Sequence, residues 1–251
     1  MNGQEWADAL YEAWVSGSLK PAPAADIEGA NIELAYQAQA AFISLCEPAS
    51  DIAGFKGALT TKNAQKMFDA SEAVSGVLLE EMRLDGDLPI NIGGFNRGVI
   101  ETEIGFRIGK PVTRPINSSE LLGYVDYCLP MIELGDVGFE RQPGLLDLVA
   151  GNAAASRFLA GSRSGIKSVN DVTVTLSRNG TVLHEASGRD AMGDQFEAAA
   201  WLVNRAVRQG YEIVPGQYLM TGSLGSIQPM EPGYYIADYG RFGDIEFEIE
   251  A

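Results

Sequence analysis

The chain has 251 residues, of which 46% are hydrophobic and 21% are charged, as expected for a globular protein with one sizeable core. Its formal net charge of −16 repels nucleic-acid phosphates and anionic lipid headgroups, so we expect neither nucleic-acid nor membrane partners. The acidic N-terminus lacks the apolar stretch of a signal peptide, and no run approaches the roughly 18 apolar residues of a membrane span. We therefore expect a cytoplasmic protein.

Two amphipathic helices are predicted in the N-terminal fifth of the chain. Residues 3–16 place two tryptophans and a leucine at helical intervals, with acidic residues between them. A second apolar pattern begins after Asn31, which favours the N-cap position of a helix, and ends before Pro48. The sequence therefore predicts a helical N-terminal part over residues 1–50.

The pattern changes after residue 50. From residue 51 to residue 251, short apolar and β-branched runs alternate with Gly, Pro and Asn, which is typical of a sheet-rich core. The run 172–186 alternates apolar and polar residues on either side of Asn179 and Gly180, the strongest hairpin signal in the chain. We expect further strands over residues 211–250, joined by Pro-Gly and Gly turns.

One clear helix is predicted within this β-rich part, over residues 194–210. Asp194 is its candidate N-cap, and Gly210 is its candidate end. Helices at the N-terminus followed by a β-rich core of residues 51–251 indicate an α+β fold.

The scarcity of histidine and cysteine narrows the chemistry that the chain can support. Cys46 and Cys128 are far apart and lack metal-binding spacing, so we expect both to be reduced core residues. His184, the single histidine, lies in the second strand of the predicted hairpin without a nucleophile signature nearby, which favours a structural role. Catalysis would then depend on carboxylates, lysines or a cofactor.

Glu101 and Glu103 lie one residue apart in an apolar, β-branched run, so on a strand their side chains share one face. Two interpretations are open: the acidic face of a solvated edge strand, or a metal site in which a cation offsets the repulsion between the carboxylates. Glu133 is the only acid in a second apolar run, where it needs a partner or a cation. Three oxygen donors without Cys or His suggest Mg²⁺ or Mn²⁺.

A lysine in a glycine-flanked apolar turn is the second candidate feature. Lys56 lies in "GFKGALTT", where a cation near hydroxyl and backbone N–H groups suits a substrate that carries a carboxylate. Lys62 follows two threonines, and an exposed surface lysine is an equal alternative for it. The glycines of "TGSLGS" lack the spacing of a nucleotide-binding loop, and we expect no nucleotide site.

Several motifs occur in a characteristic order: "GFKGALTTKNAQ", "GVLLEEM", "VIETEIGFRIG", "LPMIELGD", "VAGNAAASRFLAGS" and "MTGSLGSIQPMEPGYYIADYG". Together they resemble the 2-keto-4-pentenoate hydratase / 4-oxalocrotonate decarboxylase family of the fumarylacetoacetate hydrolase-like superfamily. The resemblance runs from about Asp51 to the C-terminus, and the two N-terminal helices fit the same layout. It implies a mixed β-roll-like core with a helical N-terminal part, and self-association into a homo-oligomer.

The resemblance also implies a site. Mg²⁺ or Mn²⁺ would be held by Glu101, Glu103 and Glu133, and Lys56 would contact the substrate and assist proton transfer. The substrate would be a 2-oxo or 2-hydroxydienoic acid that chelates the metal and reacts through a stabilised enolate in a hydration or decarboxylation. The implied substrate-binding residues are Thr61, Lys62, Asn152 and Ser223.

The chain also departs from the family pattern at three places. Val74 stands where the family commonly has Asp, Ala154 stands where a serine is expected, and an arginine usually just before the E-x-E pair is shifted to Arg97. The metal-ligand positions are kept, while part of the surrounding shell is apolar. One alternative is therefore tautomerisation, C–C hydrolysis or decarboxylation of another β-dicarbonyl acid. A metal-binding module that has lost catalysis is a further alternative.

Overall fold

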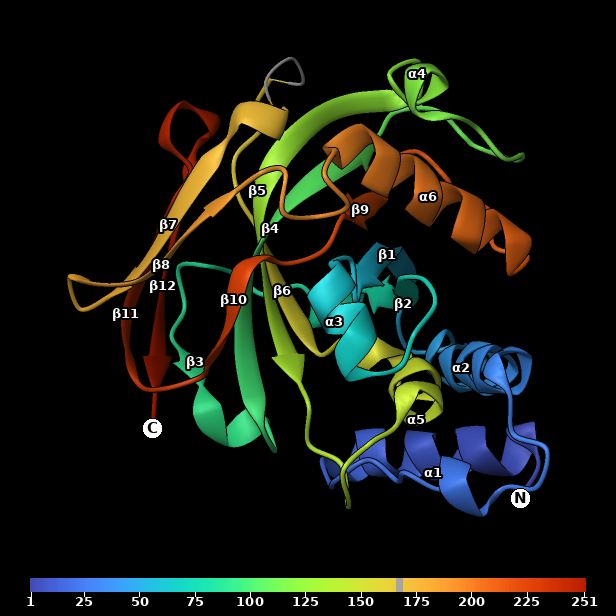
Figure 1. Ribbon diagram of the computed structural model, residues 1–251. Coiled ribbons are helices and arrows are strands. Elements are labelled where there is room, and N and C mark those ends of the chain that lie inside the picture. Colours follow the sequence, from blue (N-terminus) through green and yellow to red (C-terminus); the bar gives the residue numbers. More distant parts are fainter. Residues whose placement is uncertain (166–168) are drawn as a thin grey trace.

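The computed structural model describes residues 1–165 and 169–251 (Figure 1). The helices are α1 (Gly3–Ser16), α2 (Ile32–Cys46), α3 (Lys62–Met67), α4 (Ser118–Leu121), α5 (Leu145–Ala150) and α6 (Gln195–Arg208). The strands are β1 (Ile52–Ala58), β2 (Val74–Leu79), β3 (Ile90–Asn91), β4 (Gly98–Ile108), β5 (Val125–Asp136), β6 (Arg157–Ala160), β7 (Thr173–Arg178), β8 (Thr181–Ser187), β9 (Tyr218–Met220), β10 (Leu224–Pro229), β11 (Gly233–Asp238) and β12 (Asp244–Glu250).

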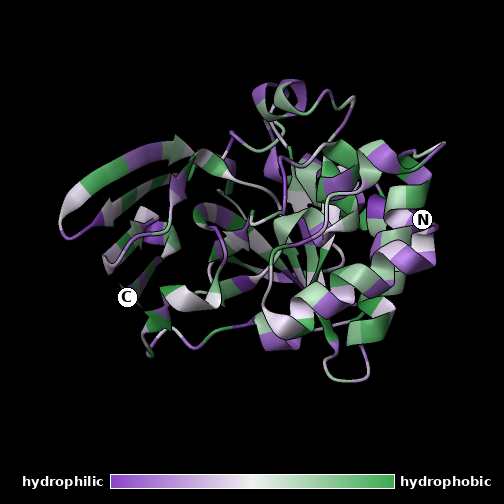
Figure 2. Ribbon diagram, turned by 90° about the horizontal axis from the view of Figure 1, so that it is seen from below, coloured by the Kyte–Doolittle hydropathy of each residue, from purple (hydrophilic) through white to green (hydrophobic). Residues whose placement is uncertain are grey.

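Local capping explains where the two N-terminal helices begin. In α1 the Asn2 side chain accepts a hydrogen bond from the Glu5 N–H, and the Glu5 carboxylate accepts one from the Asn2 N–H. In α2 the Asn31 side chain accepts from the Leu34 N–H, so the predicted cap is confirmed. Both helices are amphipathic, with hydrophobic and hydrophilic segments side by side in Figure 2. They pack against each other, and α2 also packs against α5 (Figure 1). The boundary at residue 50 stays a prediction.

Two mixed sheets form the rest of the fold. The larger has the order β2-β1-β9-β4-β5-β6, with β10 also paired to β4, and the smaller has the order β3-β12-β11-β7-β8. Most neighbours are antiparallel, but β1–β9 and β3–β12 are parallel. Figure 1 shows β4 and β5 as long curved strands through the middle of the molecule, with the β7, β8, β11 and β12 sheet on one side. The predicted α+β class with a curled, mixed sheet is confirmed.

The predicted hairpin and the predicted long helix of the core are both confirmed. Strands β7 and β8 are joined by Asn179 and Gly180, which have φ of 50° and 79°, as a two-residue hairpin turn requires. Helix α6 begins after Asp194, whose carboxylate accepts from the N–H groups of Phe196 and Glu197. The helices α3, α4 and α5 were not predicted, because segments of four to six residues are too short to show a helical period.

The core is continuous between the helices and the larger sheet. Its largest fully buried side chains include Trp6, Phe55, Phe106 and Phe158. Cys46 and Cys128 are both buried and free, as expected. Within the described ranges, every helix is too short or too polar to cross a bilayer.

Candidate active site

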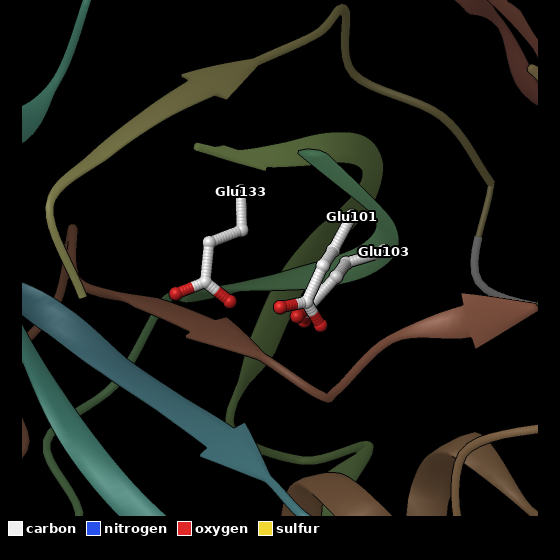
Figure 3. A group of neighbouring side chains, drawn as sticks. All are labelled: Glu101, Glu103 and Glu133. Carbon is white, nitrogen blue, oxygen red and sulfur yellow. The ribbon is translucent and has the colours of Figure 1, made fainter. Parts of the chain in front are cut away.

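Three carboxylates meet at the centre of the larger sheet. Strands β4 and β5 pair antiparallel with Glu101 directly opposite Glu133, and Glu103 lies two residues further along the same face of β4. One oxygen from each of the three carboxylates lies within 4.8 Å of the other two. Figure 3 shows all three carboxylates turned into the same space.

These glutamates do not form the acidic face of a solvated edge strand. Strand β4 is paired on both sides, by β9 and β5, so it is an interior strand. Glu103 is 0% exposed, Glu133 is 1% exposed, and Glu101 is half-buried. Since like charges directly opposite one another destabilise a sheet, this arrangement needs a compensating positive charge or protons.

Lys56 supplies one positive charge from strand β1, which is separated from β4 by β9 in the same sheet. Its Nζ lies 2.8 Å from Glu133 Oε1 and donates a hydrogen bond to the Ala153 carbonyl at 3.0 Å. The side chain is 2% exposed. Burial favours the neutral amine, but the carboxylates, with Glu133 foremost among them, outweigh burial and raise the pKa of Lys56. The lysine is therefore a buried ammonium held against the glutamate cluster.

One ammonium does not neutralise three carboxylates. Burial, followed by the charge of Glu133, raises the pKa of Glu101 to about 7. The same two causes raise the pKa of Glu103 well above its ordinary value, although the Gly222 N–H donates to Glu103 Oε2 at 2.6 Å. The cluster consequently resists full ionisation unless a further cation is added.

The donor set fits a hard divalent cation. Among the described residues, Glu103 Oε1 and Glu133 Oε2 are buried without a hydrogen-bond donor. The Ser223 hydroxyl is also buried, and it lies beside the Glu101 carboxylate. Buried carboxylate oxygens left without donors are the ligands that Mg²⁺ and Mn²⁺ prefer, and neither Cys nor His is needed for such a site. These residues therefore fit the divalent metal that the resemblance implied.

The predicted substrate-binding residues do not all lie together. Ser223 adjoins the carboxylate cluster, and Asn152 lies beside Lys56, where its amide bonds to the backbone of β2. Thr61 and Lys62 instead begin helix α3: the Thr61 hydroxyl caps the helix, and Lys62 is exposed and donates to Gln65. Both line a separate cavity of about 470 Å³. For Lys62, this position matches the surface alternative.

Of the departures from the family pattern, Val74 lies on the same face of the sheet as Lys56. In the pairing of β1 and β2, Lys56 lies opposite Gly76 and Ala58 lies opposite Val74, so the side chains of Ala58 and Val74 share the lysine's face. Val74 is 2% exposed, and Ala154 is 7% exposed. Arg97 has an exposed side chain and touches the core through its backbone N–H, which donates to Asp136.

Sequence reasoning missed three groups that hold the cluster in place. They are the Ala153 carbonyl, the Gly222 N–H and the Tyr239 hydroxyl, which accepts from the Glu103 N–H at 3.2 Å and donates to the Met131 carbonyl at 2.8 Å. Two of the three are backbone groups, whose roles leave no side-chain signal. Tyr239 lies far from the glutamates in the sequence, and only the fold brings it behind β4.

The sole histidine contacts the opposite face of the same strand. His184 Nε2 lies 3.1 Å from the hydroxyl of Thr102, whose side chain points away from Glu101 and Glu103. Burial lowers the pKa of His184. The histidine thus packs behind the carboxylate cluster rather than within it.

Comparisons with known proteins agree with this architecture. No family model matches the chain. The chain is 29% identical over 260 residues to 2-keto-4-pentenoate hydratase from Paraburkholderia xenovorans, covering 99% of this chain and 95% of the relative. It is 25% identical over 187 residues to 4-oxalocrotonate decarboxylase from Pseudomonas sp. (strain CF600), covering 72% of this chain and 71% of the relative.

Two solved structures share the fold. 4-Oxalocrotonate decarboxylase from Pseudomonas putida G7, complexed with magnesium and adipate, superposes with a TM-score of 0.93 at 21% identity, covering 99% of this chain and 97% of that one. A fumarylacetoacetate hydrolase family protein from Yersinia pestis superposes with a TM-score of 0.61 at 14% identity, covering 80% of this chain and 95% of that one. The chain is thus similar along nearly its whole length to members of the 2-keto-4-pentenoate hydratase / 4-oxalocrotonate decarboxylase family, and it has a fumarylacetoacetate hydrolase-like fold.

Proposed function

We propose that the protein is a metal-dependent lyase of the hydratase or decarboxylase type, acting on a 2-oxo or 2-hydroxydienoic acid. The observation that carries this proposal is the buried cluster of Glu101, Glu103 and Glu133 with Lys56 against it. The names of the relatives, which are hydratases of 2-keto-4-pentenoate and decarboxylases of 4-oxalocrotonate, supply the reaction class and the kind of substrate.

Glu101, Glu103 and Glu133 would hold Mg²⁺ or Mn²⁺, in line with the magnesium-bound decarboxylase of the same fold. When bound, the cation supplies Lewis-acid stabilisation of the negative charge that develops on the substrate oxygens. The half-buried position of Glu101 leaves the substrate an approach from solvent, whereas Glu103 and Glu133 are closed off by the sheet.

Lys56 would act as the proton-handling residue and would attract the substrate carboxylate. Its ammonium has three donors, so one N–H stays free after the contacts with Ala153 and Glu133. Its neighbours on the same face of the sheet, Ala58 and Val74, are apolar. Of these three side chains, the lysine is therefore the one able to give or take a proton. Tyr239 and Gly222 would hold Glu103 still while the proton moves.

The proposal is tested with a 2-hydroxydienoate substrate in Mg²⁺, followed by its ultraviolet absorbance. We expect turnover that EDTA abolishes and that Glu101→Gln lowers at least about 100-fold. Glu80→Gln is a matched control, because Glu80 is an exposed acid whose ion-pair partner among the described residues is Arg83. Turnover that persists unchanged in Glu101→Gln and in EDTA would rule the assignment out.

The apolar residues Val74 and Ala154, which are both buried, motivate a second candidate within the same chemistry. A member with these residues would carry out tautomerisation, C–C hydrolysis or decarboxylation of another β-dicarbonyl acid. Product analysis separates the candidates by CO₂ release, water incorporation or neither. Tight metal binding without turnover on a panel of 2-oxo acids would instead favour a module that has lost catalysis. A cytoplasmic location and a homo-oligomeric state remain part of the proposal.

A further inference from the structure

Three consecutive residues next to Lys56 adopt a backbone conformation that L residues rarely use. Asn152, Ala153 and Ala154 have φ of 59°, 49° and 61°, and none of them is glycine. Asparagine tolerates this left-handed region, but alanine has no side-chain hydrogen bond that favours it. Contacts elsewhere must therefore hold this left-handed turn in place.

The Asn152 side chain provides such a contact. Its Oδ1 accepts from the Val77 N–H at 2.7 Å, and its Nδ2 donates to the Val77 carbonyl at 2.8 Å. Asn152 is 1% exposed, and Val77 lies in the middle of strand β2. The amide thus fastens the left-handed turn to the sheet through both of its polar atoms.

The left-handed turn contacts the Lys56 side chain directly. The Ala153 carbonyl accepts from Lys56 Nζ at 3.0 Å, while Glu133 Oε1 lies 2.8 Å from the same nitrogen. The turn also lies directly against β2 at Gly76, where an added Cβ would be 2.6 Å from the Asn152 carbonyl oxygen and 3.1 Å from Lys56 Cδ. Glycine at this position is what allows the turn, the strand and the lysine to come this close.

We infer that Asn152 is a positioning residue: by clamping Val77 it holds the left-handed turn so that the Ala153 carbonyl aims Lys56 at Glu133. This role differs from the direct substrate contact that the sequence resemblance implied for Asn152. It rests on the proposed function only for the catalytic role of Lys56, because the positioning itself is a property of the protein without substrate.

Two variants disturb the turn by independent routes. Asn152→Gly accepts the positive φ but removes the clamp, so any effect comes from the lost hydrogen bonds. Gly76→Ala leaves Asn152 intact and pushes the turn away from β2. The matched control is Asn204→Ala: Asn204 on helix α6 makes the same double contact at 2.8 and 2.7 Å, but to the N–H and carbonyl of Ile116 rather than to β2. Alanine is compatible with the helical backbone at position 204, just as glycine is compatible with the left-handed backbone at position 152.

The primary readout is the side-chain ammonium signal of Lys56 in protein labelled with ¹⁵N-lysine, identified by its loss in Lys56→Met. We expect a protected signal in the wild type and in Asn204→Ala, and its loss in both Asn152→Gly and Gly76→Ala. Asn152→Asp keeps the acceptor for the Val77 N–H and tolerates the turn, so it should retain a weakened signal. Since the two turn variants act independently, failure of one to fold leaves the other to decide.

The kinetic readout separates positioning from substrate contact. We expect Asn152→Gly to lower kcat about tenfold or more while KM changes less than about threefold. A variant that keeps the Lys56 signal and kcat and only raises KM would overturn the inference in favour of direct substrate binding. A wild-type protein without turnover would contradict the proposed function, and the ammonium signal would still decide the role of Asn152. Absence of a protected Lys56 signal in the wild type would overturn the inference as well.

Discussion

Glu101 on β4 and Glu133 on β5 are directly opposite one another in an antiparallel pair that lies inside the sheet. Two facing carboxylates at this position work against strand pairing, because like charges across a pair repel and burial weakens their solvation. The pairing between β4 and β5 is nevertheless the longest in the protein, running from Gly98 to Ile108. The fold thus keeps a locally unfavourable pair in a well-supported position, which is typical of a functional site.

The stability of the metal-free protein is expected to fall as the pH rises. The pKa of Glu101 is 4.5 in the unfolded chain and about 7 in the fold, so between these values the folded state binds more protons than the unfolded state. Stability decreases with pH wherever this holds, and the contribution is fully lost above the folded pKa. Thermal unfolding in EDTA at about pH 5.5 and about pH 8 checks this.

Mg²⁺ is expected to reverse that trend, because a cation stabilises the ionised carboxylates and binds them better at higher pH. The rise in Tm on adding Mg²⁺ should therefore be larger at about pH 8 than at about pH 5.5. Glu101→Gln should weaken the pH dependence of the Tm both in EDTA and in Mg²⁺, since an amide does not titrate. An equal Mg²⁺ shift at the two pH values would contradict a site built from carboxylates with raised pKa.

Glu103 and Glu133 are expected to respond in opposite ways when each is changed to glutamine in the metal-free protein. Glu103→Gln removes a buried charge and still accepts from the Gly222 N–H, so the free energy of unfolding should rise. Glu133→Gln leaves the Lys56 ammonium buried without its ion-pair partner, which should cost about 3–5 kcal/mol. Denaturant unfolding in EDTA measures both, and equal effects of the two changes would contradict this account.

Lys56→Met is expected to separate metal binding from catalysis. The ammonium lies against the carboxylates and repels any cation bound there, so removing it should leave Mn²⁺ affinity unchanged or increased at about pH 8. Activity should nevertheless fall at least about 100-fold, because the proton-handling group is gone. Isothermal titration with Mn²⁺ and a turnover assay check the two halves. Weaker Mn²⁺ binding in Lys56→Met would mean that the lysine organises the ligands rather than the substrate.

Gly222 is expected to be required for metal binding, because of both its backbone conformation and the space around its Cα. Its φ is +114°, and an added Cβ would lie 2.4 Å from Thr60, so Gly222→Ala should displace the N–H that donates to Glu103. Gly180→Ala is the matched control, since Gly180 has φ of +79° and open space around its missing Cβ. Both should lower stability, by about 1 kcal/mol for Gly180→Ala, but only Gly222→Ala should weaken Mn²⁺ binding. Calorimetric titration of both variants provides the test.

Features that depend on local patterns could be predicted from the amino-acid sequence. The helices α1, α2 and α6 and the hairpin at Asn179 were predicted because periodicity, caps and turn residues act within a few neighbouring positions. That Glu101 and Glu103 share one face follows in the same way from the two-residue period of a strand. Ordered motifs along the chain were enough to indicate the family.

How these residues act together depends on contacts between segments that are distant in the chain. Whether β4 is an edge or an interior strand, and that Glu133 lies opposite Glu101, depends on strand pairing between distant segments, which leaves no mark in either segment alone. The same holds for the left-handed turn at Asn152, whose conformation is supported by β2 about 75 residues earlier in the chain. Register, burial and the positions of backbone carbonyls arise from long-range packing. Together they bring the acidic residues and the lysine into one candidate metal site.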